Sequence, residues 1–128
     1  MLRDAHAERA ERWTVAHAHA PLVVSHWTAP EVSSALALRV RSGVLTESGR
    51  DRALAGWHRM QRDTLRTLAV DTAHFARAAA LVDRHALGLR APDALHLAIA
   101  EATGATMVTF DDRLAEACRA LGVALSEI

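Results

Sequence analysis

The 128-residue chain has no excess charge of either sign. Fifteen basic residues balance fifteen acidic ones, and every basic residue is an arginine. A protein that coats nucleic acid by charge alone needs a basic surface, so the neutral balance excludes that class. It leaves room for an acidic catalytic site beside a local basic face. Hydrophobic residues make up 51% of the chain, which excludes extensive disorder.

Several other features are missing. Cys118 is the only cysteine, which excludes an internal disulfide and a cysteine-rich zinc site. No apolar run is long enough to span a bilayer, and the N-terminus lacks a signal-peptide core, so we expect a cytoplasmic protein without membrane contact. The eight histidines form no His-Glu-x-x-His pattern. A phosphate-binding glycine loop and a Gly-x-Ser-x-Gly motif are also absent, which leaves nucleotide-binding and serine-hydrolase functions without support.

Short apolar runs alternate with amphipathic helical segments along the chain. Strands are predicted at residues 22–25, 67–70, 106–110 and 123–125. Helices are predicted at about 2–19, 28–43, 46–65, 71–88, 92–104 and 111–122. This alternation predicts an α/β sandwich with a mainly parallel sheet. No linker or repeat interrupts it, so we expect a single domain over residues 1–128.

Helical spacing also predicts which side chains are buried. The helix beginning at residue 71 or 72 is expected to turn Phe75, Ala78, Ala79 and Val82 inward. Trp57 is interpreted first as a core residue of the helix before it.

Three carboxylates share a setting at the start of predicted helices. Glu31 follows the strand ending at Ser25, Asp111 follows the strand ending at Phe110, and Asp93 stands in the first turn of its helix. In a parallel α/β sheet, the carboxyl ends of strands and the adjoining helix starts line one crevice. Carboxylates that converge there repel one another unless a hard divalent cation neutralises them, and Mg²⁺ or Mn²⁺ is the expected ion.

A purely structural interpretation of each carboxylate stays open. Glu31 can complete a capping box with Thr28, Asp93 suits the positive end of a helix, and Asp111 is a good N-cap. What favours a site is the conjunction of all three on one predicted edge.

The sequence segments around these carboxylates resemble those of the PIN-domain family. Residues 89–98 (LRAPDALHLA) are similar to the segment that carries an acidic metal ligand. Residues 108–115 (VTFDDRLA) are similar to the later motif, in which a threonine or serine precedes the aspartate by two. Residues 22–25 and 29–36 (LVVS, APEVSSAL) resemble the second strand and its glutamate helix. Among PIN proteins, the VapC toxins of toxin–antitoxin pairs look most similar.

The resemblance implies a three-layer α/β/α sandwich with a mainly parallel sheet. It also implies a metal-dependent endoribonuclease in which Glu31, Asp93 and Asp111 hold Mg²⁺ or Mn²⁺ and water attacks RNA without a covalent intermediate. Thr109 would steady the site by hydrogen bonding, and Asp112 would be a supporting or capping group. The implied partners are RNA, a cognate antitoxin and a second copy of the chain.

The sequence departs from the family at its start. PIN domains open with an apolar central strand that ends in a metal-binding aspartate, whereas here a helix follows Met1 at once. Asp4 lies on that helix and is not interpreted as the ligand. The first strand is therefore predicted to be missing, through a start codon assigned too late or through decay of the gene. This favours, as the alternative function, a PIN-derived module that engages an antitoxin or a second subunit but does not cut. A third interpretation is a generic α/β domain whose carboxylates only cap helices.

Arginines crowd the segment between the first two predicted strands. They are Arg39, Arg41, Arg50, Arg52, Arg59, Arg62 and Arg66. A solvated helix surface with local ion pairs explains most of them. Some could contact RNA phosphates. In VapC-like proteins this region also helps to bind the antitoxin or a second subunit, so an exposed Trp57 would point to such a contact.

Overall fold

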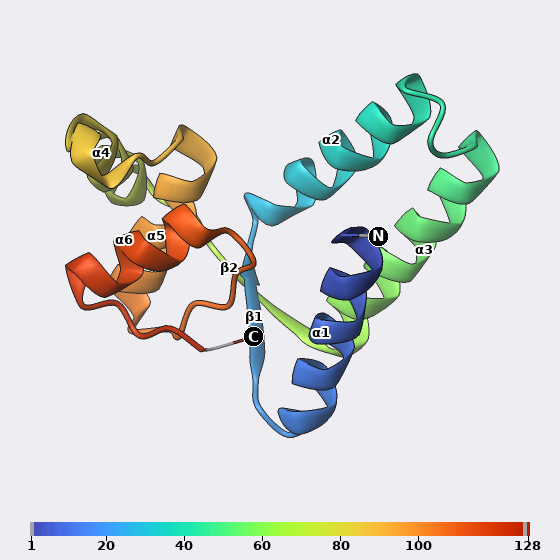
Figure 1. Cartoon of the computed structure of the whole chain (residues 1–128), viewed down its shortest axis with the longest axis horizontal. Coiled ribbons are helices and arrows are strands. Elements are labelled where there is room, and N and C mark those ends of the chain that lie inside the picture. The colour runs from blue at the N-terminus through green and yellow to red at the C-terminus, as the bar shows by residue number, and fades with distance from the viewer. Residues whose placement is uncertain (1, 127) are drawn as a thin grey trace. The chain divides into compact units, whose positions relative to one another are not determined.

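The structure, a computed structural model, describes residues 2–126 and 128, with side chains described from residue 8 onward. The helices are α1 (Leu2–Ala16), α2 (Thr28–Arg41), α3 (Glu47–Asp63), α4 (Thr72–Asp83), the 3₁₀ turn η1 (His85–Leu87), α5 (Ala91–Thr103) and α6 (Asp112–Leu121), as Figure 1 shows. The strands are β1 (Leu22–Ser25) and β2 (Leu65–Leu68). The mixed α/β class with a parallel sheet is confirmed. No helix in the described part of the chain is long and apolar enough to cross a membrane.

The chain divides into two compact units. Unit 1 comprises Met1–Ala20 and Asp71–Ile128, and unit 2 comprises Pro21–Val70. The expectation of a single domain over residues 1–128 stays a prediction.

Unit 2 is built around a parallel strand pair. β1 and β2 run in parallel with Leu22 opposite Leu65 and Ser25 opposite Leu68, and the amide of His26 extends the pairing by donating to the Leu68 carbonyl at 3.0 Å. β2 begins two residues earlier than the predicted strand 67–70 because its pairing with β1, rather than its own apolar pattern, sets its ends.

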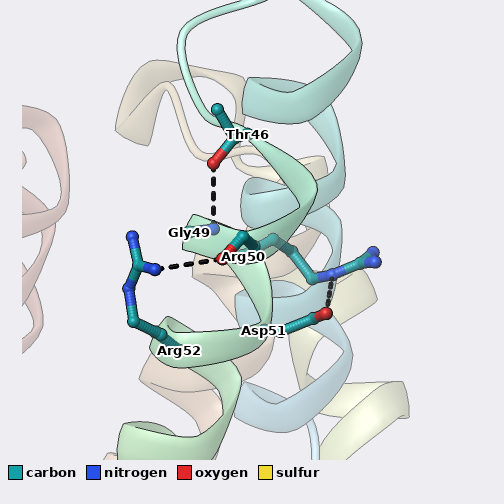
Figure 2. Close-up of polar contacts among 6 residues, drawn as sticks. Thr46, Gly49, Arg50, Asp51 and Arg52 are labelled. Carbon is teal, nitrogen blue, oxygen red and sulfur yellow. Dashed lines mark hydrogen bonds and ion pairs between the residues drawn. The ribbon is translucent and has the colours of Figure 1, made fainter.

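α2 and α3 follow β1 as a helical hairpin (Figure 1). α3 begins close to where the sequence predicts, because the hydroxyl of Thr46 accepts the amide of Gly49 at 3.0 Å and so caps the first turn (Figure 2). Ser25 is the only buried residue among the described residues of unit 2. Trp57, interpreted from sequence as a core residue, is half-buried.

Unit 1 contains every buried hydrophobic side chain of the described residues. α5 supplies half of them, namely Ala94, Leu95, Leu97, Ala98, Ile99 and Ala100. A helix that is apolar on nearly all sides is stable only when it is enclosed. α4 and α6 both contact α5, so α5 is the central element of this unit.

Glycines end two of these helices as the sequence predicts. Gly104 follows α5 with φ of 70° and Gly122 follows α6 with φ of 71°. Both take the left-handed conformation that glycine adopts without steric cost, so each helix stops where the sequence places the glycine.

An ion pair joins α4 to α5. Arg77 donates from Nε and Nη2 to the two carboxylate oxygens of Glu101 at 2.7 and 3.0 Å. The hydrogen bonds from Arg77 lower the pKa of Glu101. Both side chains are about one third exposed or more, so solvent screening limits this pair to at most about 1 kcal/mol.

α1 is tied to the last residues of the chain. The indole N–H of Trp13 donates to the Ser126 hydroxyl at 2.9 Å, and the Arg9 guanidinium donates to the backbone carbonyl of Ile128. Arg9 also lies 5.4 Å from the centre of the Phe110 ring, within the range of a cation–π contact. The helix predicted at the N-terminus is therefore part of unit 1. The side chain of Asp4 lies outside the described part of the chain.

Two predictions about unit 1 were wrong. The segment 106–110 forms only a single parallel bridge, between Met107 and Leu125. A segment with strand propensity forms a strand only where a neighbouring segment supplies a full ladder of backbone hydrogen bonds. Here the residues around Leu125 bond to Met107 alone. The predicted helix 71–88 ends at Asp83 and is followed by η1.

The predicted inward face of α4 was also wrong in part. Ala78 is buried as expected, but Phe75 is 53% and Val82 36% exposed, and Leu81 is the fully buried leucine. α4 is a single outer helix against α5, so only a narrow stripe of it is covered.

Substitution of a core leucine tests this assignment of the core. Leu97→Ala is expected to lower the free energy of unfolding by about 2–5 kcal/mol, because the Leu97 side chain is fully buried. The control is Phe75→Ala, which removes a larger but exposed side chain and is expected to cost less than about 1 kcal/mol. Urea denaturation of the two variants checks both values, and a larger loss for Phe75→Ala would contradict the observed face of α4.

Candidate metal centre

The first candidate carboxylate, Glu31, follows a tightly bonded turn between β1 and α2. The Ser25 side chain, 4% exposed, accepts the amide of Trp27 at 3.1 Å, and the Thr28 hydroxyl accepts the amide of Ser25 at 3.3 Å. Thr28 is therefore the first helical residue rather than the N-cap, and the predicted Thr28–Glu31 capping box was wrong. The turn uses the hydroxyl that the capping box would need. Glu31 stands half-buried in the first turn of α2.

The indole N–H of Trp27 is a polar group that sequence reasoning missed. Its nitrogen is buried and has no hydrogen-bond partner in the described part of the chain. A buried donor without a partner carries a desolvation cost of about 1–3 kcal/mol. No sequence pattern marks it, because a tryptophan beside a strand is normally just a packing residue.

Asp93 stands in the first turn of α5. The helix begins after Arg90 in an extended conformation, with Pro92 in the first turn, as the sequence predicts. Asp93 is half-buried, and the next residue, Ala94, is fully buried. The burial of α5 therefore fixes the backbone that carries this carboxylate.

Asp111 is the N-cap of α6, so its predicted capping role is confirmed. Its Oδ1 accepts the amide of Leu114 at 3.0 Å. The Thr109 hydroxyl accepts the amide of Asp111 at 3.0 Å, which fixes the backbone of the aspartate. Asp112 is the exposed first residue of α6. Capping occupies one carboxylate oxygen of Asp111, and Oδ2 accepts no hydrogen bond from the described residues.

The three predicted ligands are divided between the two units. Asp93 and Asp111 belong to unit 1, on helices that contact each other, and Glu31 belongs to unit 2. Among the residues described, no group of three His, Cys, Asp or Glu side chains is near enough to hold one metal ion. The structure places each carboxylate at a helix start.

The chemistry of these donors nevertheless fits a hard divalent cation. All three are carboxylates in the first turn or at the N-cap of a helix. Oxygen ligands suit Mg²⁺ and Mn²⁺, and helix N-termini attract the anionic groups of a phosphodiester.

The model of the PIN domain family matches residues 1–120. The chain belongs to the PIN domain family. A comparison with curated proteins gave no match. PIN domains are in general metal-dependent nucleases, which agrees with the oxygen-donor set described above.

Arg9 is a neighbour of this PIN motif that sequence reasoning did not find. It contacts Phe110, the residue before Asp111, although the two are about one hundred positions apart in the sequence. Only the docking of α1 on the end of the chain brings them together.

Replacing Asp111 separates its capping role from a ligand role. Asp111→Ala is expected to lower the free energy of unfolding by about 1 kcal/mol, because the Leu114 amide loses its acceptor. Asp111→Asn keeps a side-chain oxygen for the cap and is expected to lose less. Urea denaturation measures both, and equal losses for the two variants would argue that Oδ1 does not cap α6.

Proposed function

We propose that this PIN domain is an endoribonuclease that depends on Mg²⁺ or Mn²⁺ and acts as the VapC-like toxin of a toxin–antitoxin pair. The family match over residues 1–120 carries the proposal. The LRAPDALHLA and VTFDDRLA segments support it, since both supply a carboxylate at a helix start.

In this proposal Glu31, Asp93 and Asp111 hold the ion. When bound, such an ion activates a water molecule and stabilises the charge that develops on the phosphate. Thr109 steadies Asp111 through its backbone amide, and Asp112 adds negative charge at the start of α6. Asp111 can serve as cap and ligand together, because the cap uses only Oδ1.

The proposal extends to partners and place of action. It includes a cognate antitoxin that covers the site, a homodimer, a cytoplasmic location and a single PIN-like domain over residues 1–128. Leu2–Ala16, ahead of β1, form α1.

A binding module without nuclease activity is the second candidate. The observation that favours it is the exposure of large apolar side chains on α2, on α3 and in the loop between them: Leu38 is 59%, Val44 62% and Met60 47% exposed. Exposed apolar groups of this kind suit a protein partner such as an antitoxin or a second subunit.

Cleavage of a labelled RNA tests the two candidates. The wild-type chain is expected to cut in Mg²⁺ or Mn²⁺ and to stop in EDTA, while Asp93→Asn loses at least about a hundredfold in rate because one ligand of the ion becomes neutral. The matched control is Asp83→Asn, which removes an equal charge at an exposed position of α4 and is expected to cut like the wild type.

Circular dichroism of each sample shows whether it is folded. A folded wild-type chain that does not cut any RNA would favour the binding module. Full activity of Asp93→Asn would reject Asp93 as a ligand.

A further inference from the structure

The two units carry opposite net charges. Unit 2 holds seven arginines against four carboxylates, a formal charge of +3. Unit 1 holds the other eight arginines against eleven carboxylates, a formal charge of −3. The neutral total therefore conceals a basic unit, and two of the candidate ligands, Asp93 and Asp111, account for only part of the acidic one.

α3 concentrates positive charge on one side. Leu54, Trp57 and Gln61 are half-buried and mark its covered face. Arg52 and Arg59 are exposed and lie seven residues apart, which places both on the opposite face at an axial separation of about 10 Å. Arg62, also exposed, lies one turn beyond Arg59. We refer to Arg52, Arg59 and Arg62 as the basic face of α3.

The guanidinium groups of this face are available to a ligand. Arg52 donates from one nitrogen to the Ser48 hydroxyl at 3.0 Å, on the side of α3 away from the Arg50–Asp51 pair (Figure 2). Arg59 has no ion-pair partner among the described residues, and its Nη2 lies beside Gly56, 3.7 Å from where a Cβ of that residue would stand.

The basic face has only one acidic neighbour at the spacing that pairs side chains along a helix. Positions three and four residues from Arg52 are Ser48, Gly49, Ala55 and Gly56. Arg59 has Arg62 at i+3, a like-charge pair that destabilises a free helix, and Asp63 at i+4. Asp63 pairs with Arg62 at 3.2 Å, but both side chains are more than 60% exposed, so this pair is weak. A polyanion that neutralises the face would relieve the repulsion.

We propose that the basic face of α3 binds the phosphate groups of the RNA chain. Guanidinium groups bind phosphate oxygens through paired, charge-assisted hydrogen bonds, and three of them spread over about 15 Å can follow one strand. The contacts are to phosphate, so they add affinity for any RNA sequence and none for a particular base. This inference rests on the proposed nuclease function, because it identifies RNA as the polyanion.

The salt dependence of RNA binding tests the proposal. The full chain is titrated with a fluorescein-labelled single-stranded RNA in EDTA, which prevents cutting, at several salt concentrations. Each lost phosphate contact lowers the slope of log K against log salt by about 0.7 for a single strand, so Arg52→Ala/Arg59→Ala is expected to lower it by about 1.4. Arg52→Lys/Arg59→Lys keeps the charge and is expected to keep most of the slope.

The control removes the same charge from unit 1. Arg12 and Arg84 are exposed, and Arg12→Ala/Arg84→Ala is expected to bind RNA with the wild-type slope.

An unchanged slope for Arg52→Ala/Arg59→Ala would overturn the proposal and indicate that the basic face of α3 binds a protein partner instead. Equal losses in the two double-alanine variants would also overturn it, because net charge alone would then explain binding. A wild-type chain that neither binds RNA in EDTA nor cuts it with metal would reject the proposed function itself. A wild-type chain that cuts RNA, with α3 variants that bind normally, would reject only this inference.

Discussion

The burial of α5 is the constraint on which the rest of unit 1 depends. Six of its residues are buried in an unbroken run except for His96, so the helix has little freedom to shift or rotate. Its first turn carries Asp93, and α6, which contacts it, carries Asp111 at its N-cap. Ordinary core packing therefore helps to position the backbones of two of the three candidate ligands.

The acidic residues combine two physical roles that are often treated as alternatives. A carboxylate at a helix start stabilises the helix, and the same location points a negative group toward a surface where amide N–H groups attract phosphate. Asp111 shows how the roles coexist, because Oδ1 accepts the Leu114 amide while Thr109 holds the backbone. The structural interpretation of this residue is correct, and it does not compete with a ligand role for Oδ2.

Local chemistry explains why the helices could be predicted from the sequence. Thr46, Asp111, Gly104 and Gly122 act on their immediate neighbours, so their effect on helix ends is visible in a short window. The strand predicted at 106–110 failed because a strand depends on a partner elsewhere in the chain, and only a bridge at Met107 forms.

The candidate site was predictable only in part, for a similar reason. The two PIN-like segments, LRAPDALHLA and VTFDDRLA, correctly predicted that Asp93 and Asp111 lie at the starts of helices. The buried indole of Trp27 and the contact of Arg9 with Phe110 depend on packing over long sequence separations and have no local signal. The exposure of Phe75 also escaped prediction, because periodicity shows that a helix has an apolar stripe but not how much of the stripe a neighbour covers.

The central proposal is that Glu31, Asp93 and Asp111 serve as ligands of a divalent cation. Titration of the full chain with Mn²⁺, followed by electron paramagnetic resonance of the free ion, tests it most directly. The account predicts one tight site in the wild type that Glu31→Gln and Asp93→Asn each weaken at least tenfold, with the fold unchanged. Binding of Mn²⁺ by Glu31→Gln with wild-type affinity would contradict the claim.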